Sequence, residues 1–209
     1  MKLILISSSS GIEKEVEILT SMFEKGLQTL HLRKPKYSTP KLKKLLQSIP
    51  SQYHNRIVIH SHHNLVLKFD LKGVHLTKSH KRRRLKTWFT LMMIKRRKPD
   101  ILITTSYTKL GNILEAEKQY SYVFLSPIFD SSTSKYQAGF TEHSLLGTLK
   151  KTPYKVIARG GVDIDHIAKV QELGFYGLAI HSAIWNIDDP VTEFESYINK
   201  FKELGIPAE

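Results

Sequence analysis

Two short motifs near the end of the chain have the residue types needed to bind a phosphate group. Gly160 and Gly161 follow one apolar run, and a second run ends at His181-Ser182. Adjacent glycines let main-chain N–H groups approach a ligand closely, and the start of a following helix adds partial positive charge that attracts an anion. Either motif alone is equally consistent with a tight turn or a helix cap. Together they predict a phosphate site formed by Gly160, Gly161, His181 and Ser182.

The elements that position these motifs alternate between β-branched runs and longer amphipathic stretches, a pattern that predicts a parallel sheet with crossover helices. We expect strands at 2–6, 27–32, 56–60, 73–76, 101–104, 120–125, 154–158 and 175–180. We expect a helix from Ser9 or Ser10 to Gly26, a helix that starts at Ser38, and a short helical stretch that ends at Phe69. Further helices are expected at about 82–97, 110–118, 141–150, 162–173 and 188–204. Eight such units predict an α/β fold, a (β/α)8 TIM barrel in which residues 1–209 form one domain. Functional residues of such barrels lie where the strands end.

Composition narrows the classes of function. The chain has 209 residues, no cysteine and a formal net charge of +13. The lack of cysteine excludes disulfides and thiolate metal sites and suits a cytoplasmic location. No apolar run has the ~18 residues that a membrane span needs, so we expect no membrane partner.

The positive charge is concentrated in residues 80–84 and 95–98. We interpret the segment between them as a solvated helix with basic ends and with Leu85, Phe89, Met92 and Met93 on one side. A nucleic-acid partner is ranked last because no nucleic-acid-binding motif accompanies the charge.

Five stretches, in order along nearly the whole chain, resemble the thiamine phosphate synthase/TenI family. Leu30-His31-Leu32-Arg33-Lys34 resembles the family's Gln-Leu-Arg-Glu-Lys, and Gly73-Val74-His75-Leu76 matches its Gly-Val-His-Leu. Ser126-Pro127-Ile128-Phe129, with Thr133 and Lys135 beyond, resembles Gly-Pro-Ile-Phe-Pro-Thr-x-Thr-Lys. The Gly-Gly pair and the Gly-x-Ala-x-x-Ser-Ala-Ile stretch around Ser182 resemble its phosphate-binding segments.

The resemblance implies a protein of thiamine biosynthesis whose partner is a phosphorylated small molecule: thiazole phosphate, pyrimidine diphosphate or thiamine phosphate. Gly161, His181 and Ser182 would bind the thiazole phosphate, and Arg33 would pair with the diphosphate through its planar guanidinium. Lys135 would cover the anion, while Lys34, Ser106 and Thr133 would contact substrate. The oligomeric state is left open, a homodimer included.

Three positions depart from the family pattern. The synthase has Asn-Asp after strand three, where this chain has His60-Ser61, and a second Asp at about His80. Both carboxylates expected to bind Mg²⁺, which prefers hard oxygen ligands, are therefore missing. We expect weak or no synthase activity. The histidine that TenI-type tautomerases use is replaced by Thr108, and the neighbouring Tyr107 could transfer a proton only if its pKa fell well below ~10. The alternative is a non-catalytic protein that binds a thiamine precursor or has a regulatory role.

Histidines offer two further hypotheses. His60, His62 and His63, with His75 or His80, could bind Zn²⁺ through imidazole nitrogens, but hydrogen-bonded or solvent-facing histidines explain the same spacing, so we assign no metal site. His31 and His60 stand near strand ends, where either could act as a general base. The candidate catalytic residues are therefore His31, Arg33, His60, Tyr107 and Lys135.

Overall fold

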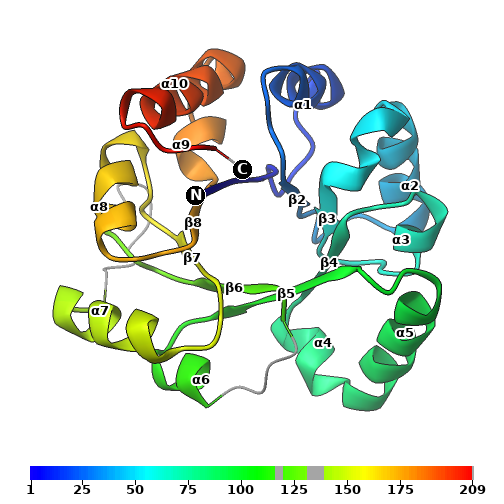
Figure 1. Ribbon diagram of the computed structural model, residues 1–209. Coiled ribbons are helices and arrows are strands. Elements are labelled where there is room, and N and C mark those ends of the chain that lie inside the picture. The colour runs from blue at the N-terminus through cyan, green and yellow to red at the C-terminus, as the bar shows by residue number, and fades with distance from the viewer. Residues whose placement is uncertain (116–119, 131–138, 209) are drawn as a thin grey trace. The chain divides into compact units, whose positions relative to one another are not determined.

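The computed structural model describes residues 1–115, 120–130 and 139–208. All eight expected strands are present: β1 (Lys2–Ile6), β2 (Leu30–Leu32), β3 (Ile57–Ile59), β4 (Gly73–Leu76), β5 (Leu102–Tyr107), β6 (Tyr122–Leu125), β7 (Val156–Arg159) and β8 (Gly177–Ile180). They form a closed barrel in the order β1 to β8 (Figure 1), and each pair whose register is known is parallel. The predicted (β/α)8 barrel is confirmed.

The chain divides into two compact units, which are described separately. The N-terminal unit comprises Ile6–Thr105, and the C-terminal unit comprises Met1–Leu5 with Ser106–Glu209. That residues 1–209 act as one domain stays a prediction.

In the N-terminal unit, β2, β3, β4 and β5 pair side by side. The helices are α1 (Glu15–Glu24), α2 (Thr39–Ser48), η1 (Ser51–Arg56, a 3-10 helix), α3 (Leu65–Lys68), α4 (Lys78–Arg82) and α5 (Arg84–Arg97). Side chains alternate across a strand, so Leu30, Leu32, Ile57, Ile59 and Val74 share one face, where all are buried. The opposite face carries His31, His60 and His75, which are buried too.

In the C-terminal unit, β7 pairs with β6 and β8, and β8 pairs with β1. Its helices are α6 (Gly111–Leu114), α7 (Glu142–Lys151), η2 (Ile164–His166, a 3-10 helix), α8 (Ile167–Glu172), α9 (Ser182–Trp185) and α10 (Pro190–Glu203). Helix α10 buries Phe194, Tyr197 and Phe201, which recur at the spacing of one helical face. This spacing anchors the last helix to its unit.

Two expectations about helices are wrong. Helix α1 begins at Glu15, after Lys14 in the left-handed conformation, because Ser9 and Ser10 bond elsewhere and do not cap it. The segment 82–97 belongs to two helices and not to one, because α4 ends at Arg82 and α5 begins at Arg84. Its apolar side chains are exposed, Leu85 at 79% and Phe89, Met92 and Met93 to a lesser degree, as expected for a solvated helix. Only Ile94 of α5 is buried. No helix in the described ranges has the length and apolar character to cross a membrane.

Candidate functional site

The turn after β7 is formed by main chain under tight steric constraint. Gly160 and Gly161 have φ values of 84° and 68°, in the left-handed region that favours glycine. A Cβ on Gly161 would lie 2.2 Å from the carbonyl oxygen of Phe129 and 2.5 Å from that of Asp130. The carbonyl of Gly160 accepts hydrogen bonds from the N–H groups of Ile128 (3.3 Å) and Phe129 (3.1 Å). The segment after β6 therefore fixes this turn, and both positions require glycine.

The end of β8 lies next to that turn within the C-terminal unit. Arg159 of β7 pairs with Ala179 of β8, so the residues that follow each strand leave the sheet at the same edge. His181 stands before α9, and its carbonyl accepts hydrogen bonds of 3.1 Å from Ile184 and Trp185. Ser182 is the first residue of α9. The two motifs predicted to bind phosphate are thus adjacent.

Ser106 and Tyr107 are the last residues of β5. The Tyr107 carbonyl accepts a hydrogen bond of 3.1 Å from the N–H of Ser126, and its ring meets that of Tyr120 edge-on at 6.5 Å. Burial, and then the neighbouring tyrosines, raise the pKa of Tyr107. The shift is opposite to the one a general base at neutral pH needs, so Tyr107 can hold a proton but will not release one readily.

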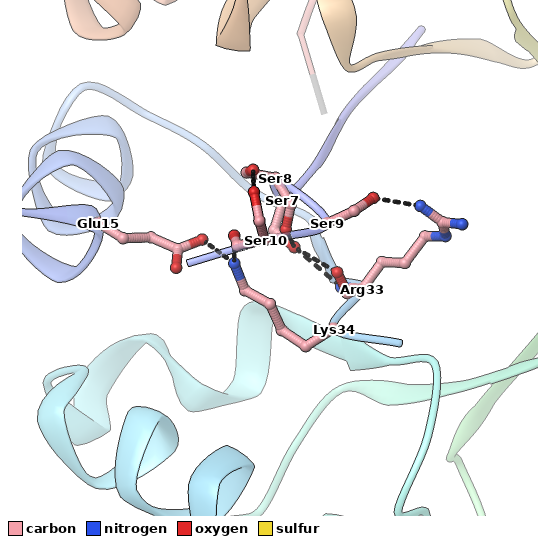
Figure 2. A network of polar contacts seen from close by, with 7 residues as sticks. All are labelled: Ser7, Ser8, Ser9, Ser10, Glu15, Arg33 and Lys34. Carbon is pink, nitrogen blue, oxygen red and sulfur yellow. Dashed lines mark hydrogen bonds and ion pairs between the residues drawn. The ribbon is translucent and has the colours of Figure 1, made fainter. Parts of the chain in front are cut away.

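In the N-terminal unit, the serine-rich loop after β1 contacts Arg33 (Figure 2). The Arg33 guanidinium donates through Nη1 to the Ser9 hydroxyl. Its main-chain N–H donates to Ser7 Oγ at 2.9 Å, and Ser8 and Ser10 lie with their hydroxyl oxygens 3.5 Å apart. Hydroxyls and a guanidinium are suitable donors for phosphate oxygens. Sequence reasoning assigned Arg33 to an anion but missed Ser9, whose signal was the run of four serines.

Lys34 belongs to a different interaction in the same network (Figure 2). Its ammonium contacts Glu15 Oε1 at 2.5 Å and the Ser10 carbonyl at 2.7 Å. Both side chains are buried, Lys34 at 0% and Glu15 at 5% exposure. Burial raises the pKa of the Glu15 carboxyl and lowers the pKa of the Lys34 ammonium, while their contact opposes both shifts. A role for Lys34 in substrate binding stays a prediction, and no local sequence pattern indicated Glu15 as its partner.

Three histidines converge on one face of the N-terminal sheet. Ile59 pairs with Val74, so the next residues along these strands, His60 and His75, lie side by side. Their rings stack at 4.1 Å. His31 Nδ1 lies 3.0 Å from His60 Nε2. One nitrogen from each of the three rings lies within 4.8 Å of the others.

Neighbouring histidines have separate partners. His62 contacts the Thr39 hydroxyl and the Tyr37 carbonyl, each at 2.8 Å. His63 donates to the His75 carbonyl at 3.2 Å and stacks on His80. Burial lowers the pKa of His63 to about 4, with the charge of His80 adding to the effect. Within the ranges that the structure describes, the ligand set suggested by sequence spacing does not assemble, whereas His31, His60 and His75 do.

The Mg²⁺ that the family resemblance implies does not fit these residues. Ser61 offers a hydroxyl, and His80 Nδ1 is 2.8 Å from the Thr77 hydroxyl, as a capping group of α4. Neither is the carboxylate ligand that Mg²⁺ usually has. Two other predicted site residues, Thr133 and Lys135, lie outside the residues that the structure describes.

Comparison with known proteins gives a consistent result. The family model described as thiamine monophosphate synthase matches residues 3–184. The chain is 21% identical to a thiamine-phosphate synthase of Methanobrevibacter smithii, over 95% of this chain and 94% of the relative. Among solved structures, it is similar to a thiamine phosphate pyrophosphorylase of Bacteroides thetaiotaomicron, with TM-score 0.75 and 28% identity over 97% and 98% of the two chains. A pyrophosphorylase of Pyrococcus furiosus has TM-score 0.74 and 20% identity over 97% and 96%.

Proposed function

This chain belongs to the thiamine monophosphate synthase family, and we propose that it binds a thiazole phosphate or thiamine phosphate at the loops after β7 and β8. The observation that carries the proposal is the pair of crowded, left-handed glycines after β7, beside the end of β8. In barrels of this type the loops after the seventh and eighth strands often form the phosphate site.

Arg33 supports a second anion-binding role, in the N-terminal unit. Its side chain is held by the Ser9 hydroxyl, which sets the direction of the guanidinium before any ligand arrives. A planar guanidinium can donate two parallel hydrogen bonds to a diphosphate. We assign Arg33 to the diphosphate of a pyrimidine substrate, with Ser106 as a separate substrate contact.

Whether the protein condenses two substrates depends on what stabilises the leaving pyrophosphate. The synthase reaction forms a C–N bond and releases pyrophosphate, whose developing negative charge needs stabilisation. Ser61 and His80 provide no carboxylate for Mg²⁺, and the raised pKa of Tyr107 disfavours it as a base. These observations favour binding without efficient synthase activity, and a precursor-binding or regulatory protein is the second candidate function.

The test is a calorimetric titration of the full chain with thiazole phosphate and, in parallel, with the unphosphorylated thiazole alcohol. We expect binding that requires the phosphate and a matching rise in melting temperature. Pyrophosphate release on adding the pyrimidine diphosphate would assign synthase activity. Binding without release would assign the precursor-binding function. Absence of binding to both thiazole phosphate and thiamine phosphate, titrated in the same way, would overturn the proposal.

Ser182→Asp places a negative charge in the proposed phosphate site. Like charges repel, so we expect thiazole phosphate binding to be lost while the circular dichroism spectrum stays unchanged. The matched control is Ser51→Asp, at an exposed position at the start of η1, which should bind as the wild type does. Equal affinity in Ser182→Asp and wild type would refute the location of the site.

A further inference from the structure

We propose that His31, His60 and His75 form a binding site for a divalent transition metal that prefers imidazole nitrogen, with Zn²⁺ as the representative ion. The site is distinct from the carboxylate site for Mg²⁺ that the family resemblance implies, and it does not depend on the proposed thiazole phosphate ligand. It lies wholly within the N-terminal unit, on the face of β2, β3 and β4 opposite the buried leucines and isoleucines.

The geometry of the three rings suits one shared ion. Two nitrogens bound to one tetrahedral Zn²⁺ lie about 3.3 Å apart, because each Zn–N bond is about 2.0–2.1 Å. His31 Nδ1 and His60 Nε2 are 3.0 Å apart, and one nitrogen of each ring lies within 4.8 Å of the others. The ring of His31 meets His60 and His75 edge-on, with centroids at 5.2 and 5.7 Å. The His60 and His75 rings stack with centroids 4.1 Å apart, so they must move apart and tilt before their nitrogens can bind one ion in tetrahedral directions.

Thr104 positions the third imidazole. It pairs with His75 in the register of β4 and β5, and its Oγ1 lies 2.9 Å from His75 Nδ1 and 3.5 Å from the Val74 carbonyl. A hydroxyl has one proton. If Thr104 donates it to Val74, the hydroxyl oxygen accepts the Nδ1 proton of His75. That arrangement puts the ring proton of His75 on Nδ1 and its lone pair on Nε2, which is the tautomer of a hydrogen-bonded histidine that ligates a metal through Nε2.

The chemistry of the surroundings selects the class of ion. All three rings are buried, at 0%, 7% and 3% exposure for His31, His60 and His75. Imidazole is a good ligand for Zn²⁺, Cu²⁺ and Ni²⁺ and a poor one for Mg²⁺ and Ca²⁺. Binding displaces the proton shared between His31 Nδ1 and His60 Nε2, so both become ligands and neither acts as a base. Three histidines leave a fourth position for water or an anionic oxygen, which would offset the buried charge.

The experiment uses the full chain, stripped with a chelator, dialysed and titrated with CoCl2 and then ZnCl2. We expect one equivalent of Co²⁺ to give the visible absorption bands of a four-coordinate ion, and one equivalent of Zn²⁺ to abolish them. MgCl2 should have no effect. A Co²⁺ spectrum like that of the aqueous ion would overturn the proposal, even if no variant can be purified.

Variants then assign the ligands. His60→Gln should weaken Zn²⁺ binding by at least 100-fold, and Thr104→Val by roughly 10–100-fold, the range found when a supporting hydrogen bond to a ligand is lost. His143→Gln, at an exposed position on α7, is the control and should bind as the wild type does. Unchanged affinity in a folded His60→Gln, or an equal loss in His143→Gln, would show that metal binds elsewhere and would refute the site.

Discussion

Replacing Lys34 with methionine tests the buried ion pair of the N-terminal unit. The substitution preserves much of the volume of the side chain and removes its charge, leaving the Glu15 carboxylate buried without the ammonium that lies 2.5 Å away. Removing one partner of a buried ion pair typically costs 3–5 kcal/mol. We therefore expect Lys34→Met to lower the free energy of unfolding by about 4 kcal/mol, equivalent to a drop of roughly 8–16 °C in melting temperature for a chain of this size.

The double variant separates the cost of the unpaired charge from the value of the pair. Glu15→Gln with Lys34→Met removes both charges, so neither is left buried alone. Because the desolvation cost of an ion pair often offsets its attraction, we expect the double variant to be more stable than Lys34→Met. Urea unfolding, followed by circular dichroism at several pH values, gives the free energy of unfolding for each protein of the double-mutant cycle: the wild type, Glu15→Gln, Lys34→Met and the double variant.

The pH dependence of Lys34→Met has a defined sign. Burial already raises the pKa of Glu15 in the wild type, and loss of the ammonium should raise it further. A carboxyl with a higher pKa in the folded than in the unfolded state binds more protons when folded, so stability falls as pH rises. The deficit of the variant should therefore grow from acidic towards neutral pH.

Lys169→Met is the matched control, because Lys169 contacts Glu142 at 2.8 Å and Glu172 at 3.2 Å on an exposed surface. Exposed ion pairs contribute little, so its unfolding curve should overlay that of the wild type. Loss of one partner of a buried pair should cost about 3–5 kcal/mol. If Lys34→Met lowers the free energy of unfolding by less than about 1 kcal/mol, the view that the Lys34–Glu15 pair stabilises the fold is refuted.

Three further substitutions test other features. Gly161→Ala should destabilise the protein by about 1–3 kcal/mol and abolish thiazole phosphate binding, because its Cβ would meet the Phe129 carbonyl. The control Gly147→Ala, in the exposed part of α7 with no atom near the added Cβ, should neither lower stability nor weaken binding. Equal melting temperatures of the two variants would contradict the crowding at Gly161. Asp163→Ala should lower the free energy of unfolding in urea by about 0.5–2 kcal/mol, as loss of a helix cap does, because the Asp163 side chain accepts a hydrogen bond from the N–H of Asp165 at the start of η2. An unchanged free energy of unfolding would show that the cap is dispensable. Leu85→Lys should change stability by no more than about 0.5 kcal/mol because the side chain is exposed, and a large loss in thermal melts would show that Leu85 is covered in solution.

The sequence predicted the strands better than the side-chain contacts, for a physical reason. Buried β-branched runs mark strands locally, so each strand was found to within a few residues. The convergence of His31, His60 and His75 depends on the register between strands, which no local pattern contains. For the same reason the sequence missed the pairing of Thr104 with His75 and that of Glu15 with Lys34.

Helix α5 shows what apolar periodicity leaves undetermined. Periodic apolar residues predicted a side of the helix carrying Leu85, Phe89, Met92 and Met93, but periodicity records amphipathic character and not what covers it. In the structure these side chains are exposed, while Phe89 and Met93 line a groove of about 570 Å³ against α3. The run of four serines misled the prediction of where α1 begins, because Ser9 bonds to Arg33 and no side chain caps the start of the helix.

The glycine turn after β7 limits how the proposed phosphate site could change its ligand. Its shape comes from main-chain atoms packed against the carbonyls of Phe129 and Asp130, so a larger residue there would disrupt the turn itself. If the proposed phosphate site adapts to a new phosphorylated compound, in evolution or in the laboratory, the change must therefore come through flanking side chains, because the turn itself has no room for a Cβ.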